Sequence, residues 1–123
     1  MKDEPEGAKS SDLRERTFAF ALSIVRLFRT TRGDVNERAL ARQFLRSGTS
    51  VGAHYREAAR ARSNAEFISK MEGGLQELDE TVYWTQLLSA AEVLPTAAAA
   101  PVLAEADELI RIFVTCVRNA KAR

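Results

Sequence analysis

The residues best suited to chemistry lie in one stretch, RSGTSVGAHYREA, which spans residues 46–58. His54 is the only histidine of the chain, and Glu57 follows it three residues later, so on a helix the two side chains share a face. An imidazole and a carboxylate at this spacing can both ligate a metal ion. A metal site in a helical bundle needs a second such helix with further inward carboxylates, and the sequence supplies none. We expect no metal and no cofactor, and keep a metal enzyme built on these two residues as one alternative.

Two glycines and three serine or threonine side chains in the same stretch resemble a loop that cradles phosphate. That loop requires the pattern G-x-x-x-x-G-K-[S/T] after a strand, and the stretch has neither the pattern nor the strand. A serine or cysteine nucleophile requires a positioned base, and the single histidine has no paired aspartate. The sequence therefore predicts a protein that is not an enzyme.

Five arginines form a stripe along the same segment. Placed on a helix, they fall within about 80° of one another, on a face that excludes the glycines. They are Arg38, Arg42, Arg46, Arg56 and Arg60. Arginines one turn apart can follow the phosphates of a nucleic acid. Alternatively, the stripe pairs with an acidic neighbouring helix, because residues 35–62 have a net charge of +4 and residues 64–94 a net charge of −5. No aromatic ladder accompanies the arginines, so stacking on bases has no support.

The small residues of the stretch belong to an apolar stripe with helical period. Within about 120° lie Leu40, Ala41, Phe44, Gly48, Val51, Gly52, Tyr55, Ala58 and Ala59. Two consistent faces predict one helix over residues 35–61, although each interior glycine disfavours the helix by about 1 kcal/mol. The residues expected to pack against a neighbouring helix are Gly48, Val51, Gly52, Tyr55 and Ala59, and the two glycines would let that helix come close.

Three other segments repeat with the same period, and no segment alternates with period two. The four helices are expected at about residues 12–32, 35–61, 64–93 and 97–120. Their N-caps are expected at Ser11 or Asp12, Asp34, Ser63 and Thr96. The connections are short, which favours an all-α protein, an antiparallel up-down-up-down four-helix bundle over residues 11–120. Residues 1–10 are expected to form a disordered tail and residues 121–123 a short second tail.

The chain has 123 residues, of which 46% are hydrophobic and 28% charged, as is usual for one globular domain. The lone cysteine, Cys116, lies in an apolar run and is expected to be a buried thiol. No stretch approaches the roughly 20 uncharged residues of a membrane span, and the first residues lack the apolar core of a signal peptide. We expect a cytoplasmic protein that does not contact a membrane.

Two groups of apolar residues fall outside the predicted core. Phe18, Leu22 and Val25 lie on the first helix, away from its core stripe, and Trp84 and Leu87 leave the main seam of the third helix. Exposed apolar surface of this kind marks protein interfaces. We predict that these five residues form the interface of a homo-oligomer. Alternatively, they belong to a wide core stripe of a small bundle.

Residues 45–88 closely resemble the four helix bundle protein family known from open reading frames in 23S rRNA intervening sequences. The resemblance is carried by residues 46–53, 57–58, 65–68 and 80–81, and by Tyr83-Trp84. The family is similar in fold to the accessory variability protein of diversity-generating retroelements, a homopentameric barrel with a basic surface that associates with a reverse transcriptase and nucleic acid. The resemblance thus implies a pentamer without catalytic activity, with nucleic acid or a nucleic-acid enzyme as a partner.

The chain departs from that family at three positions. The family usually has Asn at the position of His54 and larger residues at the positions of Gly73 and Gly74. A glycine pair inside a helix disfavours it by about 1.5–2 kcal/mol. We therefore expect a close backbone approach or a local bend at the pair.

Overall fold

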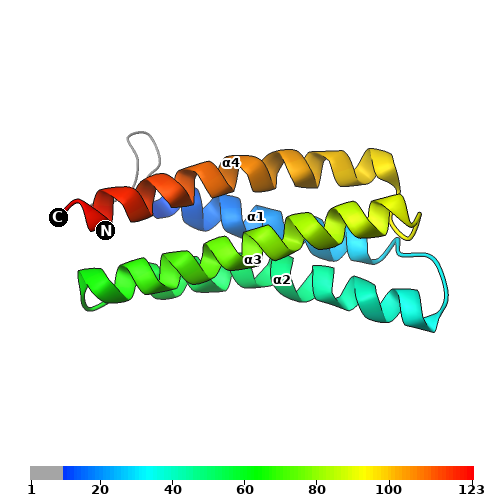
Figure 1. Cartoon of the computed structure of the whole chain (residues 1–123), viewed down its shortest axis with the longest axis horizontal. Coiled ribbons are helices and arrows are strands. Elements are labelled where there is room, and N and C mark those ends of the chain that lie inside the picture. The colour runs from blue at the N-terminus through cyan, green and yellow to red at the C-terminus, as the bar shows by residue number, and fades with distance from the viewer. Residues whose placement is uncertain (1–9) are drawn as a thin grey trace.

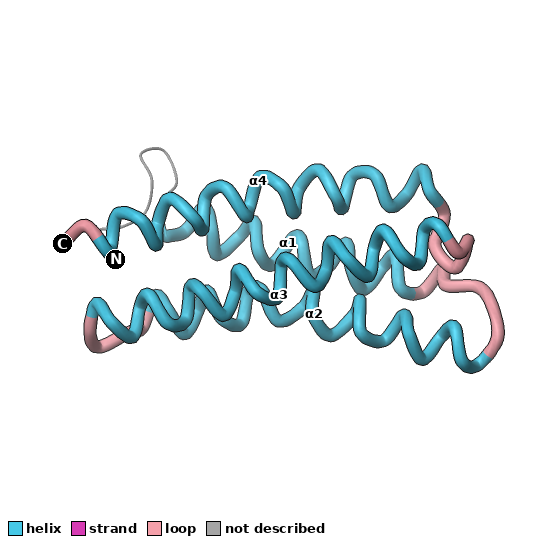
Figure 2. Tube along the Cα trace, viewed as in Figure 1, coloured by secondary structure: helices cyan, strands magenta, loops and turns pink. Residues whose placement is uncertain are grey.

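A computed structural model describes residues 10–123, which fold into four helices with no strand among them (Figure 1). The helices are α1 (Ser10–Phe28), α2 (Val35–Ala59), α3 (Asn64–Ala90) and α4 (Thr96–Lys121). Consecutive helices contact each other and α4 also contacts α1, whereas no Cα atoms of α1 and α3 come within 8 Å of each other. Short connections join the helices into an all-α four-helix bundle, which confirms the predicted fold class (Figure 2). The disordered tail predicted for residues 1–10 lies, except for the helical Ser10, outside the described residues.

Two helices end earlier than their apolar periodicity predicts. α1 stops at Phe28 and not at residue 32: the hydroxyls of Thr30 and Thr31 donate to the carbonyls of Leu27 and Phe28, at 2.7 and 2.9 Å. Such local side-chain bonds compete with continuation of a helix. α3 stops at Ala90 and not at residue 93.

A left-handed residue forms the end of α3. Glu92 has φ +62°, and the N–H groups of Val93 and Leu94 both donate to the carbonyl of Leu88, at 2.9 and 3.1 Å. This geometry satisfies a carbonyl that the end of a helix leaves unbonded. α2 and α4 differ less from expectation: Arg60 is already the C-cap of α2, and Lys121 belongs to α4, where its Nζ lies 3.1 Å from Glu72 Oε2 of α3.

The predicted caps are right for α2 and α3. Asp34 accepts from the N–H of Glu37 at 2.9 Å, and the Glu37 carboxylate accepts from the N–H of Asp34 at 2.9 Å, which is a complete capping box. Ser63 Oγ accepts from the N–H of Glu66 at 3.0 Å, but the Glu66 carboxylate accepts from the N–H of Arg62 and not from that of Ser63.

The predicted caps are wrong for α1 and α4. Asp12 lies inside the first turn of α1, because that helix already begins at Ser10. Thr96 is the first residue of α4, and its cap position is taken by Pro95, which has no side chain to accept a hydrogen bond. Instead, the Thr96 hydroxyl accepts from Ser89 Oγ of α3 at 3.3 Å.

Each helix contributes one stripe to a continuous core. The largest fully buried side chains come from all four helices and the α3–α4 turn: Tyr55, Phe44, Phe67, Phe113, Leu13, Ile24, Met71, Leu78, Leu88, Leu94, Leu109 and Val51. Cys116 is buried as expected. Leu40, which periodicity placed on the packing stripe, is 44% exposed, because it lies in the second turn of α2, at the end of the bundle. None of the helices in residues 10–123 is long and apolar enough to cross a membrane.

Candidate interaction surfaces

The stretch at residues 46–58 forms the C-terminal half of α2, and its glycines face α1. A Cβ atom on Gly48 would lie 2.6 Å from Ile24 Cγ1, and one on Gly52 would lie 3.3 Å from Thr17 Oγ1. Side chains at these positions would separate the two helices, so the glycines allow α1 and α2 to come close. Of the other predicted packing residues, Val51 and Tyr55 are buried and Ala59 is half-buried against the core.

The hydroxyls of this stretch are turned toward their own helix. Ser47 donates to the carbonyl of Phe44, Thr49 to that of Leu45 and Ser50 to that of Arg46. Ser47 also accepts from the Thr81 hydroxyl of α3, at 3.0 Å in the core. These groups are thus engaged in helix packing and do not form a loop that could surround a phosphate.

His54 faces α3 and fills the space above its glycine pair. A Cβ atom on Gly73 would lie 2.7 Å from both Cε1 and Nδ1 of His54, and one on Gly74 would lie 2.7 Å from Phe113 Cε2. Nδ1 is buried and has no hydrogen-bond partner among the described residues, while Nε2 lies 3.7 Å from Glu77 Oε2. The absent side chains of α3 are therefore replaced by side chains from α2 and α4.

The metal pair considered from the sequence, His54 with Glu57, does not come together. Glu57 Oε1 lies 2.9 Å from Lys70 Nζ of α3, whereas the imidazole is directed at Glu77. The hydrogen bond between Glu57 and Lys70 lowers the pKa of Glu57 and raises the pKa of Lys70. Across residues 10–123, no group of three His, Cys, Asp or Glu side chains gathers in a geometry that could hold a metal ion.

The arginine stripe of α2 is exposed along its length, but its members have different surroundings. Arg46 lies on the α3 side, where its guanidinium is 3.2 Å from Glu77 and 2.5 Å from Glu80. Arg56 lies on the α1 side, with its guanidinium carbon 6.0 Å from the ring centroid of Phe18.

The other three arginines, Arg38, Arg42 and Arg60, make no ion pair with any residue between 10 and 123. Both interpretations of the stripe therefore hold in part. Arg46 pairs with the acidic residues of α3, and these three arginines remain available to an anion such as a phosphate.

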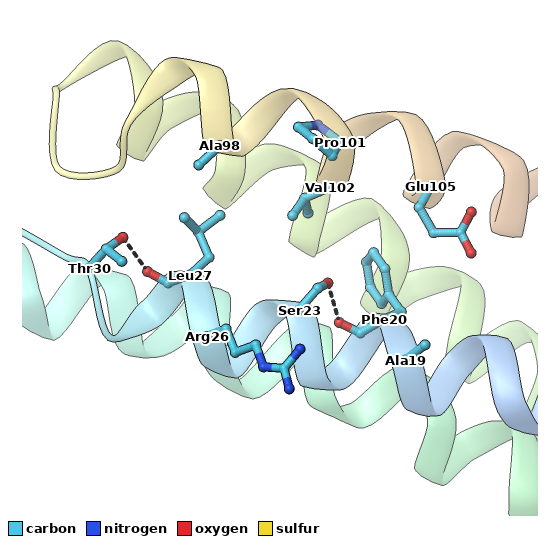
Figure 3. Close-up of a pocket in the computed structure, with 10 residues that line it drawn as sticks. All are labelled: Ala19, Phe20, Ser23, Arg26, Leu27, Thr30, Ala98, Pro101, Val102 and Glu105. Atoms are coloured by element: carbon cyan, nitrogen blue, oxygen red, sulfur yellow. Dashed lines mark hydrogen bonds between the residues drawn. The ribbon is translucent and has the colours of Figure 1, made fainter.

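A groove of about 530 Å³ separates α1 from α4 (Figure 3). Phe20, Leu27 and Val102 line it with apolar surface. Its hydroxyls, on Ser23 and Thr30, each donate to a backbone carbonyl of α1 at 2.7 Å, as the dashed lines show. Apart from the charged side chains of Arg26 and Glu105, which also line it, the groove therefore has few polar groups free to orient a ligand.

An ion pair joins α1 to α4 at this groove, where Glu105 is one of the lining residues. Arg16 Nη2 and Nε donate to the two carboxylate oxygens of Glu105, at 2.7 and 3.1 Å. Nη2 also lies 3.3 Å from Glu108. The hydrogen bond to Glu105 raises the pKa of Arg16 above its ordinary value, so the guanidinium stays charged.

The apolar residues predicted for an oligomer interface lie at the surface of two helices. On α1, Phe18 is 60% exposed, Leu22 is exposed and Val25 is half-buried. On α3, Leu87 is 38% exposed and Trp84 is half-buried against the core.

Two further apolar residues, which the predicted interface does not include, are exposed. Tyr83 is 58% exposed and packs edge-on against Trp84, with ring centroids 5.0 Å apart. It lies one turn before Leu87 on the same face of α3, so helical spacing alone groups it with the predicted interface residues. Leu40 of α2, which was predicted to be buried, is the other.

Comparison with known proteins places this bundle in a family. The profile of the 23S rRNA-intervening sequence proteins matches residues 9–115. A crystal structure of a protein with unknown function from the S23 ribosomal protein family of Bacteroides thetaiotaomicron VPI-5482 is similar, with a TM-score of 0.78 and 32% identity, over 89% of this chain and 97% of that one. No curated protein matches the chain. The family match spans nearly all of the bundle, and the chain belongs to the 23S rRNA-intervening sequence protein family.

Proposed function

We propose that this protein is a non-enzymatic assembly module, an antiparallel up-down-up-down bundle that associates with further copies of itself in the cytoplasm, away from membranes. The observation that carries the proposal is the apolar surface of α1. Residues 17–25 contain no charged side chain, yet the bundle buries only Thr17, Phe20 and Ile24 of them. A helix that is apolar on all sides is normally covered on all sides.

A homopentamer is the proposed subunit number. Its support is the resemblance of residues 45–88 to a family that is similar in fold to a pentameric protein. The topology is supported by the α2–α3 contacts, which run in opposite directions along the two helices: Glu57 with Lys70 near the turn, and Arg46 with Glu80 farther from it.

Light scattering on the eluting peak of a size-exclusion column tests this proposal. The expected mass is about 68 kDa, five times the 13.6 kDa of one chain. Phe18→Asp and Trp84→Ala are expected to reduce the mass toward that of one chain while helicity by circular dichroism is retained. A wild-type protein that elutes as a monomer at micromolar concentration would contradict the proposal.

Nucleic-acid binding is a second candidate function, favoured by Arg38, Arg42 and Arg60, which have no ion-pair partner in the described part of the chain. Exposed guanidinium groups bind phosphates and release counterions. Repetition of the three arginines on several copies would raise a weak contact to a useful avidity.

Matched arginine variants test this second function. Arg38→Ala with Arg42→Ala is expected to weaken binding to RNA or DNA at least tenfold and to reduce its dependence on salt. Arg46→Ala is the control, because its guanidinium already pairs with Glu77 and Glu80, and it is expected to change binding much less. Binding that responds equally to both variants, or does not respond to salt, rejects this function.

A further inference from the structure

Charged side chains border the apolar residues of α1. Arg14, Phe18, Leu22, Val25 and Arg29 follow each other at intervals of three or four residues, so they form one stripe along the helix, here the α1 face. Both arginines are exposed, and neither makes an ion pair within residues 10–123. Arg56 of α2 adds a third positive charge beside Phe18. One acid, Glu15, lies near them, so the α1 face is basic overall.

The apolar residues of α3 are bordered by charge of the opposite sign. Asp79, Tyr83 and Leu87 follow each other on one exposed stripe, with Trp84 beside them, and together with Leu40 they form the α3 face. Asp79 makes no ion pair within the described chain.

Leu40 belongs to the α3 face because of the register between α2 and α3. The contacts join Ser47 to Thr81 and Glu57 to Lys70, so each step along α2 is matched by a step back along α3. Continued to the end of the bundle, this register places Leu40 at the level of Leu87. Glu77 and Glu80 share one arginine, Arg46, so these three side chains leave a net negative charge beside Asp79 and Tyr83.

The two faces cannot cover each other within one copy, because α1 and α3 lie diagonally across the bundle, with no Cα atoms of the two helices within 8 Å of each other. A contact between two α1 faces would bring unpaired arginines of both copies together, because Arg14 and Arg29 lie at the two ends of that face. A contact between two α3 faces would leave the Asp79 carboxylate of each copy with no cation of the other face opposite it. Like charges placed opposite each other disfavour an interface, whereas opposite charges select it. Only the contact of an α1 face with an α3 face joins apolar surface to apolar surface and cation to anion.

From this complementarity we infer that the α1 face of one copy docks on the α3 face of the next. Such a head-to-tail contact leaves one free face at each end, so it continues from copy to copy until a ring closes. A dimer with two equivalent faces is not formed. The inference rests on the proposed self-assembly and goes beyond it, since it assigns the partner of each face.

Mixing two variants tests this pairing. Phe18→Asp breaks the α1 face and leaves the α3 face intact, while Leu87→Arg does the reverse. Each variant alone is expected to be a monomer of about 14 kDa by light scattering, since its one intact face has no partner. An equimolar mixture is expected to form a 1:1 heterodimer of twice that mass through the two intact faces, and to stop there.

Other results would separate the possible failures. A variant that forms a homodimer on its own, or a mixture that stays monomeric while the wild type assembles, overturns the head-to-tail pairing and leaves self-assembly intact. A monomeric wild type overturns the self-assembly itself.

Controls keep this result independent of folding. Val114→Asp on α4 is the matched control, because Val114 is 37% exposed, like Leu87, but lies on neither face; it is expected to assemble normally. Leu22→Asp and Tyr83→Arg are the second pair, to be mixed in the same way if circular dichroism shows that a first variant has lost its helices.

Discussion

The seam between α2 and α3 and the seam between α1 and α4 are built differently. Along α2–α3, an imidazole sits above Gly73, two hydroxyls bond in the core, and ion pairs lie on either side of His54. Along α1–α4, one arginine holds two glutamates, and beyond it the helices separate around a groove of about 530 Å³.

The difference shows that specific side-chain contacts fix the packing of α2 on α3, whereas the packing of α1 on α4 leaves a groove. The tight seam lies within residues 45–88, the part that resembles the family most clearly. The loose seam is formed by α1, the helix whose uncharged middle is least covered by its own bundle. The α2–α3 seam is thus the more closely packed of the two, and α1 is the helix with the most apolar surface left for another molecule.

The largest expected effect compares the same substitution at two leucines. Leu78 of α3 is fully buried, whereas Leu27 of α1 lines the open groove. Leu78→Ala is expected to lower the free energy of unfolding by about 3–4 kcal/mol, because it leaves a closed cavity, and Leu27→Ala by about 2 kcal/mol, because water can enter the space. Urea unfolding measures both. Equal losses would mean that the α1–α4 seam is as well packed as the core of α3.

A smaller effect on stability is expected at Gly73, above which His54 lies, and its sign depends on whether the histidine is present. Gly73→Ala is expected to destabilise the wild type by about 1–2 kcal/mol, since the new Cβ would lie 2.7 Å from the imidazole. In a His54→Ala background the same change is expected to stabilise by about 0.5–1 kcal/mol, because alanine favours a helix. Thermal unfolding of the four proteins measures the coupling, and Gly52→Ala, whose Cβ would meet nothing closer than 3.3 Å, serves as the control. The same sign in both backgrounds would contradict the role of His54.

The smallest expected effect is the pH dependence of the ion pair between Glu57 and Lys70, which is exposed at the edge of the tight seam. The pKa of Glu57 is lowered from 4.5, so its contribution is complete above that pH and is lost as the pH falls through the lowered value. The pKa of Lys70 is raised from 10.5, so its contribution is complete below that pH and is lost as the pH rises through the raised value. Glu57→Gln is expected to lower the melting temperature by no more than about 2 °C at pH 7 and by less at pH 3. A difference of the same size at both pH values would show that the side chain acts by packing and not by charge.

Periodicity in the sequence was enough to predict four helices and most of their buried stripes, because burial of one face repeats along each helix. It could not predict the end of α1, which depends on two threonine hydroxyls that bond to the backbone. It also could not assign the arginines of α2, since a shared face does not reveal which neighbouring helix lies at each edge. Arg46 meets the acids of α3 and Arg56 meets Phe18 of α1 only because α2 lies between those two helices.

His54, Gly73 and Gly74 stayed unexplained for a related reason. Each is unusual when considered within its own helix, and the explanation is a contact between helices. Local sequence patterns describe one segment at a time, so features that compensate each other across a seam become understandable only in three dimensions.

The contact between His54 and Gly73 also constrains the order in which the two residues were acquired during descent. With the imidazole placed as it is here, a side chain at position 73 would bring its Cβ to 2.7 Å from the ring, whereas a glycine at 73 without the histidine costs about 1 kcal/mol of helix propensity. Acquiring the glycine before the histidine is therefore the order that avoids this close contact. Relatives that carry a side chain at the position of Gly73 are expected to lack the histidine.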